Sequence, residues 1–180
     1  MTRIAPVEPP FAPSVAEDLA KLMPPGLPPL ALFTTVAQNP RVLGRMRRGG
    51  LLDPGSISLR ERELVILRTT ARCGAEYEWG VHVAFFGRAA GFGEAELAAI
   101  VAGDPTAPVW SPREAALIAA CDALHDGADL PEEVWAPLRA AFDDAQIVEI
   151  VALAGYYHLV SFLTNALRLP LEPGAPAFQR

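Results

Sequence analysis

The sequence predicts an all-α fold, and three observations support this. Capping-box patterns, in which Ser or Asp is followed three residues later by Glu or Gln, begin at Ser14, Ser58, Ser111 and Asp143. Apolar residues between these points recur with a helical period. No segment shows the strict apolar–polar alternation of a β-strand. Helices are therefore predicted over residues 14–23, 29–38, 40–48, 58–72, 75–90, 94–102, 112–125, 131–141 and 144–168.

Proline and glycine set the boundaries of several of these helices. Pro40 and Pro131 are expected at first helical positions, where the missing N–H costs nothing. Gly91 and Gly127 follow apolar-periodic segments, so each is expected to adopt the left-handed conformation that ends a helix. The ends of the chain are different in character, because residues 1–12 and 169–180 are rich in proline. A single domain spanning residues 1–180, with these two segments as extended arms, is predicted.

Composition narrows the classes of partner and location. The chain has 180 residues, 51% of them hydrophobic, and a net charge of −6, which fits one globular domain with a substantial core. The acidic balance provides no broad basic surface, so nucleic acid is not expected as a partner. The first ten residues contain no apolar stretch of the kind found in a secretory signal, and a cytoplasmic location is expected.

One apolar run is long enough to be compared with a membrane-spanning helix. Residues 147–163 are long and apolar, but Glu149 and His158 interrupt them, and both side chains are costly in hydrocarbon. The run is interpreted as a core helix, and no membrane association is expected.

The two cysteines, Cys73 and Cys121, have neither metal-ligand nor C-x-x-C spacing, so the sequence predicts no disulfide scaffold and no zinc site.

The segment from Glu63 to His82 carries the strongest chemical signal. Glu63 begins a four-residue apolar run, where burial would favour a general-acid role. After the break at Cys73-Gly74, the residues Ala75, Glu78 and His82 fall on one helix face, which presents a carboxylate and an imidazole together. The same spacing is found in solvated ion pairs, and Glu63 can equally pair with a nearby arginine, so spacing leaves both interpretations open.

This segment resembles the carboxymuconolactone decarboxylase, or alkylhydroperoxidase D-like (AhpD-like), family. Peroxidase members of that family carry Glu, then C-x-x-C twelve residues later, then His four residues after the second cysteine. Glu63 and His82 match the Glu and the His, while Ala75 and Glu78 stand where the two cysteines would be. The pattern from Gln146 through Asn165-Ala166-Leu167 extends the resemblance into the second half of the chain.

The resemblance implies an AhpD-like helical domain that assembles into a homo-oligomer, from dimer to hexamer. Without the cysteine pair, the disulfide cycle of the peroxidases cannot run. The decarboxylase members also lack that pair, and the resemblance implies cofactor-independent lyase or isomerase chemistry on a small carboxylated or lactone compound. Glu63 and His82 are the candidate catalytic residues, with Tyr77, Glu78 and Trp79 as neighbours in the pocket.

Two other functions remain open at the level of sequence. Cys73, just ahead of a helix start, could support a peroxiredoxin-like antioxidant activity with a single thiol. Alternatively, the chain could keep the fold as a non-catalytic ligand-binding or assembly protein. His158 is expected either to close the pocket opposite His82 or to be a hydrogen-bonded core residue. No metal is expected, because Glu78 and His82 lack the Glu-x-x-His spacing of di-iron sites.

Overall fold

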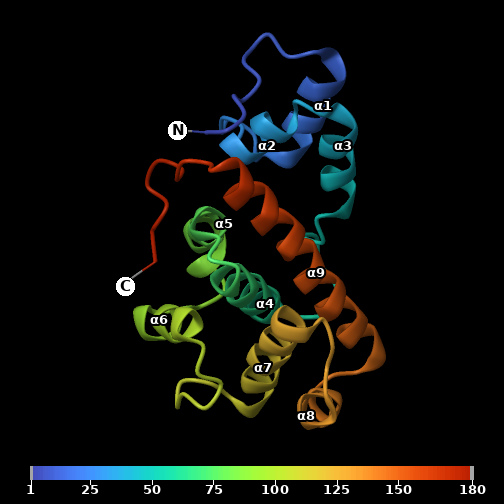
Figure 1. Cartoon of the computed structure of the whole chain (residues 1–180), viewed down its shortest axis with the longest axis vertical. Coiled ribbons are helices and arrows are strands. Elements are labelled where there is room, and N and C mark those ends of the chain that lie inside the picture. The colour runs from blue at the N-terminus through green and yellow to red at the C-terminus, as the bar shows by residue number, and fades with distance from the viewer. Residues whose placement is uncertain (1, 179–180) are drawn as a thin grey trace.

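A computed structural model describes residues 2–178, and residues 1, 179 and 180, the tips of the two predicted arms, lie outside this range. Within the described range the chain is helical and has no strand (Figure 1). The predicted all-α fold class is therefore confirmed. The helices are α1 (Pro13–Leu22), α2 (Ala31–Val36), α3 (Pro40–Gly49), α4 (Leu59–Arg72), α5 (Glu76–His82), the π-helix η1 (Val83–Gly87), α6 (Glu94–Ala102), α7 (Pro112–Gly127), α8 (Glu132–Ala141) and α9 (Asp144–Leu167).

Three of the four predicted capping boxes are present. Ser58, Ser111 and Asp143 each accept a backbone N–H of the first helical turn, and the Glu or Gln three residues later bonds back. The box predicted at Ser14 is wrong, because α1 already begins at Pro13. Proline has a fixed φ and no N–H to satisfy, so Pro13 can be the first residue of the helix, and Ser14 then lies inside it.

Three other boundaries also differ from the predictions. Gly91 has the expected positive φ of 76°, but Gly127 is the last residue of α7, and Ala128 adopts the left-handed conformation at φ 53°. Pro131 is the N-cap of α8 and does not occupy its first helical position. The predicted helix 75–90 is divided, because α5 ends at His82 and the chain continues as a π-helix through Gly87.

The helix α4 lies at the centre of the molecule and packs against α5, α6, α7 and α9. In Figure 1, α1, α2 and α3 occupy the upper end, α6, α7 and α8 the lower end, and α9 runs along the length between them. The buried side chains from both ends form one hydrophobic cluster. Every residue of α4 from Arg62 to Thr70 is buried, so polar groups in this stretch must find partners inside the protein.

The helix α9 is long and apolar enough, by length and composition alone, to cross a membrane. In this fold it packs against α4, α5, α7 and α8, and 44% of its most apolar window is buried. This packing is typical of the core helix of a globular domain, which passes the same test of length and hydropathy.

Candidate active site

The structure brings Glu63 and His82 into direct contact. Glu63 lies in the buried first half of α4, and His82 is the last residue of α5, which the turn at Cys73-Gly74 folds back against α4. Nδ1 of His82 lies 2.7 Å from Oε2 of Glu63. Both side chains are buried, Glu63 completely. A buried carboxylate thus holds one nitrogen of the imidazole and sets the orientation of the ring.

The other oxygen of Glu63 binds the preceding residue. Nε and one terminal nitrogen of Arg62 donate to Oε1 of Glu63 at 2.9 and 2.7 Å. A carboxylate that accepts from a guanidinium and from an imidazole is stabilised as an anion. The sequence predicted a proton-donating Glu63, but these surroundings suit an ionised acceptor that fixes His82. Arg62 also donates to the backbone oxygen of Leu52 at 2.6 Å.

Two groups face the second nitrogen of His82. Nε2 lies 3.0 Å from Oη of Tyr157 on α9 and 3.3 Å from Oε1 of Glu78, one turn earlier on α5. The rings of His82 and Tyr157 meet edge to face, with centroids 5.0 Å apart. Oε2 of Glu78 is buried and makes no hydrogen bond. It is therefore an acceptor that a bound molecule or a water could satisfy.

Electrostatics favour the protonated form of His82. Burial by itself lowers the pKa of this imidazole, but hydrogen bonds and charge from Glu63 and Glu78 outweigh burial and raise the pKa to about 9. Burial and the same two carboxylates hold the pKa of Tyr157 well above its usual value. At neutral pH His82 is therefore protonated, and the phenol of Tyr157 beside it is neutral.

Phe86, in the π-helix η1, is the partly exposed side chain against this cluster. Its ring centroid lies 5.3 Å from that of His82 and 5.1 Å from Cζ of Arg62. The wider turn of a π-helix places residues differently from an α-helix and often occurs at functional sites. Two surface cavities, of about 290 and 450 Å³, lie elsewhere: one is beside Val148 and Glu149, the other between α1 and residues 23–29. The side chains of Glu63, Glu78 and His82 are all buried, so a substrate could reach them only if neighbouring side chains moved.

The other residues predicted as pocket neighbours lie in the core beside the site. Ala75 is fully buried as the N-cap of α5. Tyr77 donates its hydroxyl proton to Glu172 and accepts from the backbone N–H of Leu32 at 3.0 Å. Trp79 packs against Phe178, with ring centroids 5.3 Å apart. Tyr77 and Trp79 thus fasten the C-terminal segment across α5 and do not contact His82 through these bonds.

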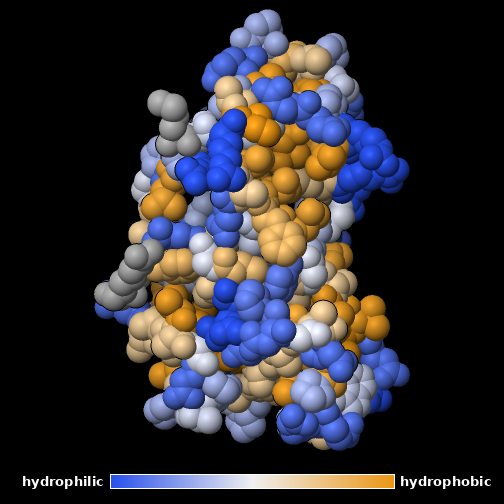
Figure 2. All heavy atoms as spheres, viewed as in Figure 1, coloured by the Kyte–Doolittle hydropathy of each residue, from blue (hydrophilic) through white to orange (hydrophobic). Residues whose placement is uncertain are grey.

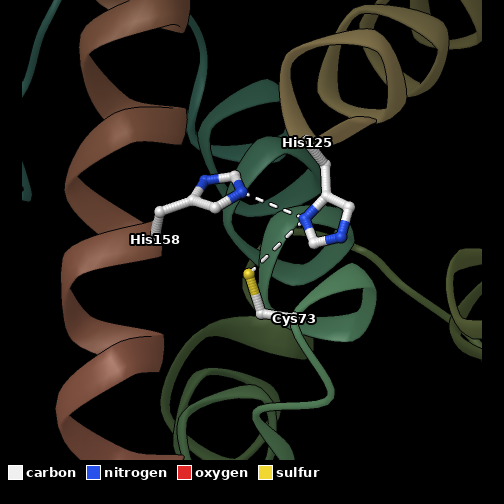
Figure 3. A group of neighbouring side chains, drawn as sticks. All are labelled: Cys73, His125 and His158. Atoms are coloured by element: carbon white, nitrogen blue, oxygen red, sulfur yellow. Dashed lines mark hydrogen bonds between the residues drawn. The ribbon is translucent and has the colours of Figure 1, made fainter. Parts of the chain in front are cut away.

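His158 does not close the site opposite His82, contrary to the prediction. Successive residues of an α-helix point about 100° apart, so Tyr157 faces His82 while His158 points elsewhere. His158 meets His125 and Cys73 at the other side of α9 (Figure 3). Cys73 therefore also lies outside the Glu63–His82 cluster, in a separate group of side chains.

Sequence reasoning missed two members of the cluster, Arg62 and Tyr157. Arg62 adjoins Glu63 in the sequence, but arginines next to a carboxylate are common on helix surfaces, and only the burial of α4 makes this pair distinctive. Tyr157 lies in the run Tyr156-Tyr157-His158, and nothing in the sequence distinguishes the middle residue of that run. Which of these residues faces His82 depends on the rotation of α9 about its axis relative to α4, and tertiary packing sets this rotation.

A comparison with known protein families identifies the family that the middle of the chain matches. Residues 38–123 match the carboxymuconolactone decarboxylase family. This segment belongs to the carboxymuconolactone decarboxylase family. It includes Arg62, Glu63, Glu78 and His82, whereas Tyr157 lies beyond the matched segment. A search among curated proteins finds no match to the chain.

Solved structures show that the fold is AhpD-like. A peroxidase-related protein from Ralstonia eutropha JMP134, described as an alkylhydroperoxidase AhpD core, is 16% identical with a TM-score of 0.82; 95% of this chain and 92% of that chain are covered. A protein of unknown function from Agrobacterium tumefaciens, a candidate antioxidant defence protein AhpD, is 21% identical with a TM-score of 0.70, covering 76% and 94%. A cysteine-to-alanine variant of the debrominase Bmp8, in complex with 2,3,4-tribromopyrrole, is 16% identical with a TM-score of 0.75, covering 96% and 92%.

Proposed function

We propose that this member of the carboxymuconolactone decarboxylase family is a cofactor-independent lyase or isomerase that acts on a small carboxylated or lactone compound by acid–base chemistry. The observation that carries the proposal is the buried imidazole of His82, held at Nδ1 by Glu63 and facing Tyr157 and Glu78 at Nε2. A histidine held by a carboxylate on one side, with its other nitrogen directed at proton-exchanging groups, is the arrangement that general acid–base catalysis requires.

Decarboxylation shows what each group would do. When the bond from carbon to the substrate carboxylate breaks, carbon dioxide leaves and its bonding electrons remain on the substrate as a carbanion or enolate. The positive charge of His82 stabilises that anion electrostatically. A proton from Nε2 of His82, passed directly or through the hydroxyl of Tyr157, then completes the product. Water returns one proton to His82, so the net change is one carboxylate and one proton consumed, with product and carbon dioxide released.

The negative residues have complementary tasks in this scheme. Glu63 accepts hydrogen bonds from Arg62 and from His82, so it keeps His82 protonated and correctly oriented. Glu78 is placed to accept a proton, because its Oε2 has no partner and its Oε1 lies 3.3 Å from Nε2 of His82. A base beside an acid also serves an isomerisation, in which one group removes a proton and the other returns it.

The geometry supports acid–base chemistry better than the peroxidase alternative. Cys73 lies among His125 and His158, away from His82, and burial raises the pKa of its thiol, which lowers the fraction of reactive thiolate. Cys121 is fully buried, its pKa is raised to about 12 by burial, and its sulfur lies 3.9 Å from the backbone oxygen of Val65. The two thiols thus occupy separate environments, neither of them suited to a dithiol cycle.

The deciding experiment is a screen of small lactones, β-keto acids and dicarboxylic acids for carbon dioxide release or isomerisation. If a substrate is found, His82→Gln is expected to lower kcat by roughly 10²- to 10⁴-fold, the usual contribution of a general acid. Normal turnover in a folded His82→Gln protein would refute the mechanism. Peroxide consumption that Cys73→Ala abolishes would favour the antioxidant alternative, and ligand binding without turnover would favour a binding protein.

A further inference from the structure

A second cluster of reactive side chains lies outside the Glu63–His82 site. It joins Cys73 at the C-terminal end of α4, His125 in the last turn of α7 and His158 in the middle of α9 (Figure 3). One ligand-type atom from each residue lies within 4.8 Å of the other two. We propose that Cys73, His125 and His158 form a binding site for one zinc-like divalent cation, and this proposal is independent of the acid–base function.

The distances between the donor atoms are those of a small metal site. Sγ of Cys73 lies 3.7 Å from Nδ1 of His125, which in turn lies 3.1 Å from Nε2 of His158. In a tetrahedral zinc site with Zn–S of about 2.3 Å and Zn–N of about 2.0–2.1 Å, neighbouring ligand atoms are about 3.3–3.6 Å apart. Both observed distances fall close to this range, and the third pair of ligand atoms lies within 4.8 Å, which a small side-chain rotation can shorten.

The orientation of His158 is already fixed as a metal ligand requires. Its Nδ1 lies 2.8 Å from the backbone oxygen of Ala154, which can only accept, so Nδ1 carries the proton. Nε2 is the other ring nitrogen, and it points toward His125 and Cys73. A backbone carbonyl that holds the second nitrogen of a histidine is the support that metal-binding histidines commonly have.

The charges around the cluster tolerate a cation. The charge of Arg72 acts on both Cys73 and His125, and Arg72 pairs with Asp122 and Asp126 on α7. Arg68 also pairs with Asp122, so two arginines and two aspartates cancel. Binding of the ion would release the proton of Cys73 to solvent as the thiolate forms. The resulting site has a net charge of about +1 and one coordination position open to solvent.

The protonation of His125 is compatible with the same role. Burial lowers its pKa, and the charges of Arg72 and His158 lower it further, which favours the neutral imidazole. A neutral imidazole can turn its unprotonated nitrogen toward an ion and keep its proton on the other nitrogen. All three side chains are partly exposed, which gives an ion from solvent a route to them.

The choice of ion follows from the donor set. One thiolate with two imidazoles suits zinc and cobalt(II), whereas magnesium and calcium prefer oxygen ligands. No short motif in the sequence indicates this site, because Cys73 and His125 are 52 residues apart and His125 and His158 are 33 apart. Short metal-binding motifs place ligands within a few residues of each other, and this set is assembled only by the packing of three helices.

Cobalt(II) titration of the untagged, chelator-treated and reduced protein tests the proposal. One equivalent is expected to bind and to produce visible d–d bands with a near-ultraviolet thiolate-to-cobalt band, and zinc is expected to displace it. Cys73→Ala should abolish the thiolate band. Cys121→Ala is the matched control, because it removes the other thiol, and it should leave the band unchanged. His125→Gln and His158→Gln should each weaken binding by at least tenfold.

Two further measurements keep the test decisive. Zinc is expected to protect Cys73 from alkylation by iodoacetamide, as located by peptide mass spectrometry, and to raise the Tm of the wild type and of Cys121→Ala but not of Cys73→Ala. Circular dichroism establishes that each variant is folded. No binding by the wild type would overturn the proposal. So would equal binding by Cys73→Ala, which would identify the metal as adventitious.

Discussion

Oη of Tyr157 lies 3.0 Å from Nε2 of His82, on the opposite side of the ring from the carboxylate of Glu63. The two partners of His82 come from α4 and α9, the helices that also form the centre of the fold. Glu63 occupies Nδ1 of His82, so exchange of a proton with a substrate is left to Nε2, which faces Tyr157 and Glu78. This asymmetry gives the site a direction for proton movement.

The hydroxyl of Tyr157 is therefore expected to matter more than that of its neighbour. Tyr157→Phe removes one hydrogen-bond partner of His82 but keeps the ring that packs edge to face against it. If the phenol relays the proton, kcat for the substrate found by screening should fall by roughly 10²-fold, within the usual range for acid–base groups. Steady-state kinetics at several pH values measure the effect.

Tyr156→Phe is the control for this substitution. Its hydroxyl donates to the backbone oxygen of Met46 at 3.1 Å and does not contact His82. It should lose some stability, of about 1 kcal/mol for a hydrogen bond, with little change in kcat. Equal losses of kcat in the two variants would show that the tyrosine pair acts through packing, and the relay through Tyr157 would be wrong.

The raised pKa of His82 predicts a pH dependence of folding. The pKa is about 9 in the folded protein against 6.5 for an unperturbed histidine, so the folded state holds the proton more tightly. The stabilisation is fully present below about pH 6.5 and is lost as the pH rises through about 9. The total is about 3 kcal/mol. Urea unfolding of the wild type and of His82→Gln between pH 6 and 10 should show this loss in the wild type only.

The same titration has a kinetic signature. If His82 acts as the acid, kcat/KM should fall on the alkaline side with an apparent pKa near 9, since this parameter reports groups of the free enzyme. Glu78→Gln removes one carboxylate that raises the pKa of His82, so the alkaline limb should move to lower pH. An alkaline limb unmoved by Glu78→Gln would assign it to a different group.

The ion pair of Arg62 and Glu63 should contribute differently to stability and to function. Glu63→Gln leaves the buried guanidinium without its charge partner, and breaking a buried pair costs roughly 3–5 kcal/mol. Replacing both residues, as in Arg62→Met with Glu63→Leu, should recover part of that loss, because the guanidinium is removed with its charge partner and only His82 still loses a neighbouring carboxylate. Thermal and urea unfolding compare the two. The double variant should nevertheless have no activity, because His82 has lost the carboxylate that orients it.

The positions of the helices were predictable because their signals are local. The caps at Ser58, Ser111 and Asp143 mark helix starts through side chains three residues apart, and the structure begins these helices within one residue of the predicted starts. The Glu63–His82 contact was also within reach, since it depends on two consecutive helices. The division of the helix after His82 into a π-helix was not, because no residue in this segment signals the change.

The remaining differences come from tertiary packing. Tyr157 and His158 are adjacent, yet one completes the cluster at His82 and the other joins Cys73 and His125. Which residue faces which neighbour depends on the rotation of α9 about its axis in the core, and a sequence fixes that rotation only through the packing of all its contacts. The long separations between Cys73, His125 and His158 hid their cluster for the same reason.

We expect copies of this chain to associate through the exposed face of α9. Val148 and Phe162 are 69% and 64% exposed, and Val151 and Leu159 lie between them on the same helix. Figure 2 shows hydrophobic atoms gathered on the face of the molecule where α9 is turned toward the viewer. Contiguous exposed apolar surface of this kind usually marks an interaction site, and a second copy of the chain is the partner expected for an AhpD-like domain.

Charged substitutions on this face test that expectation without touching the buried site. Val148→Glu combined with Val151→Glu introduces two charges that a desolvated interface would have to bury, and an unpaired buried charge is costly. Sedimentation velocity should show an oligomer for the wild type and a smaller species for the double variant at the same concentration. Lys21→Glu on α1 is a control, because its side chain lies in an exposed ion pair with Glu17, away from α9. A monomeric wild type, or a double variant with unchanged mass, would show that this face is not the interface.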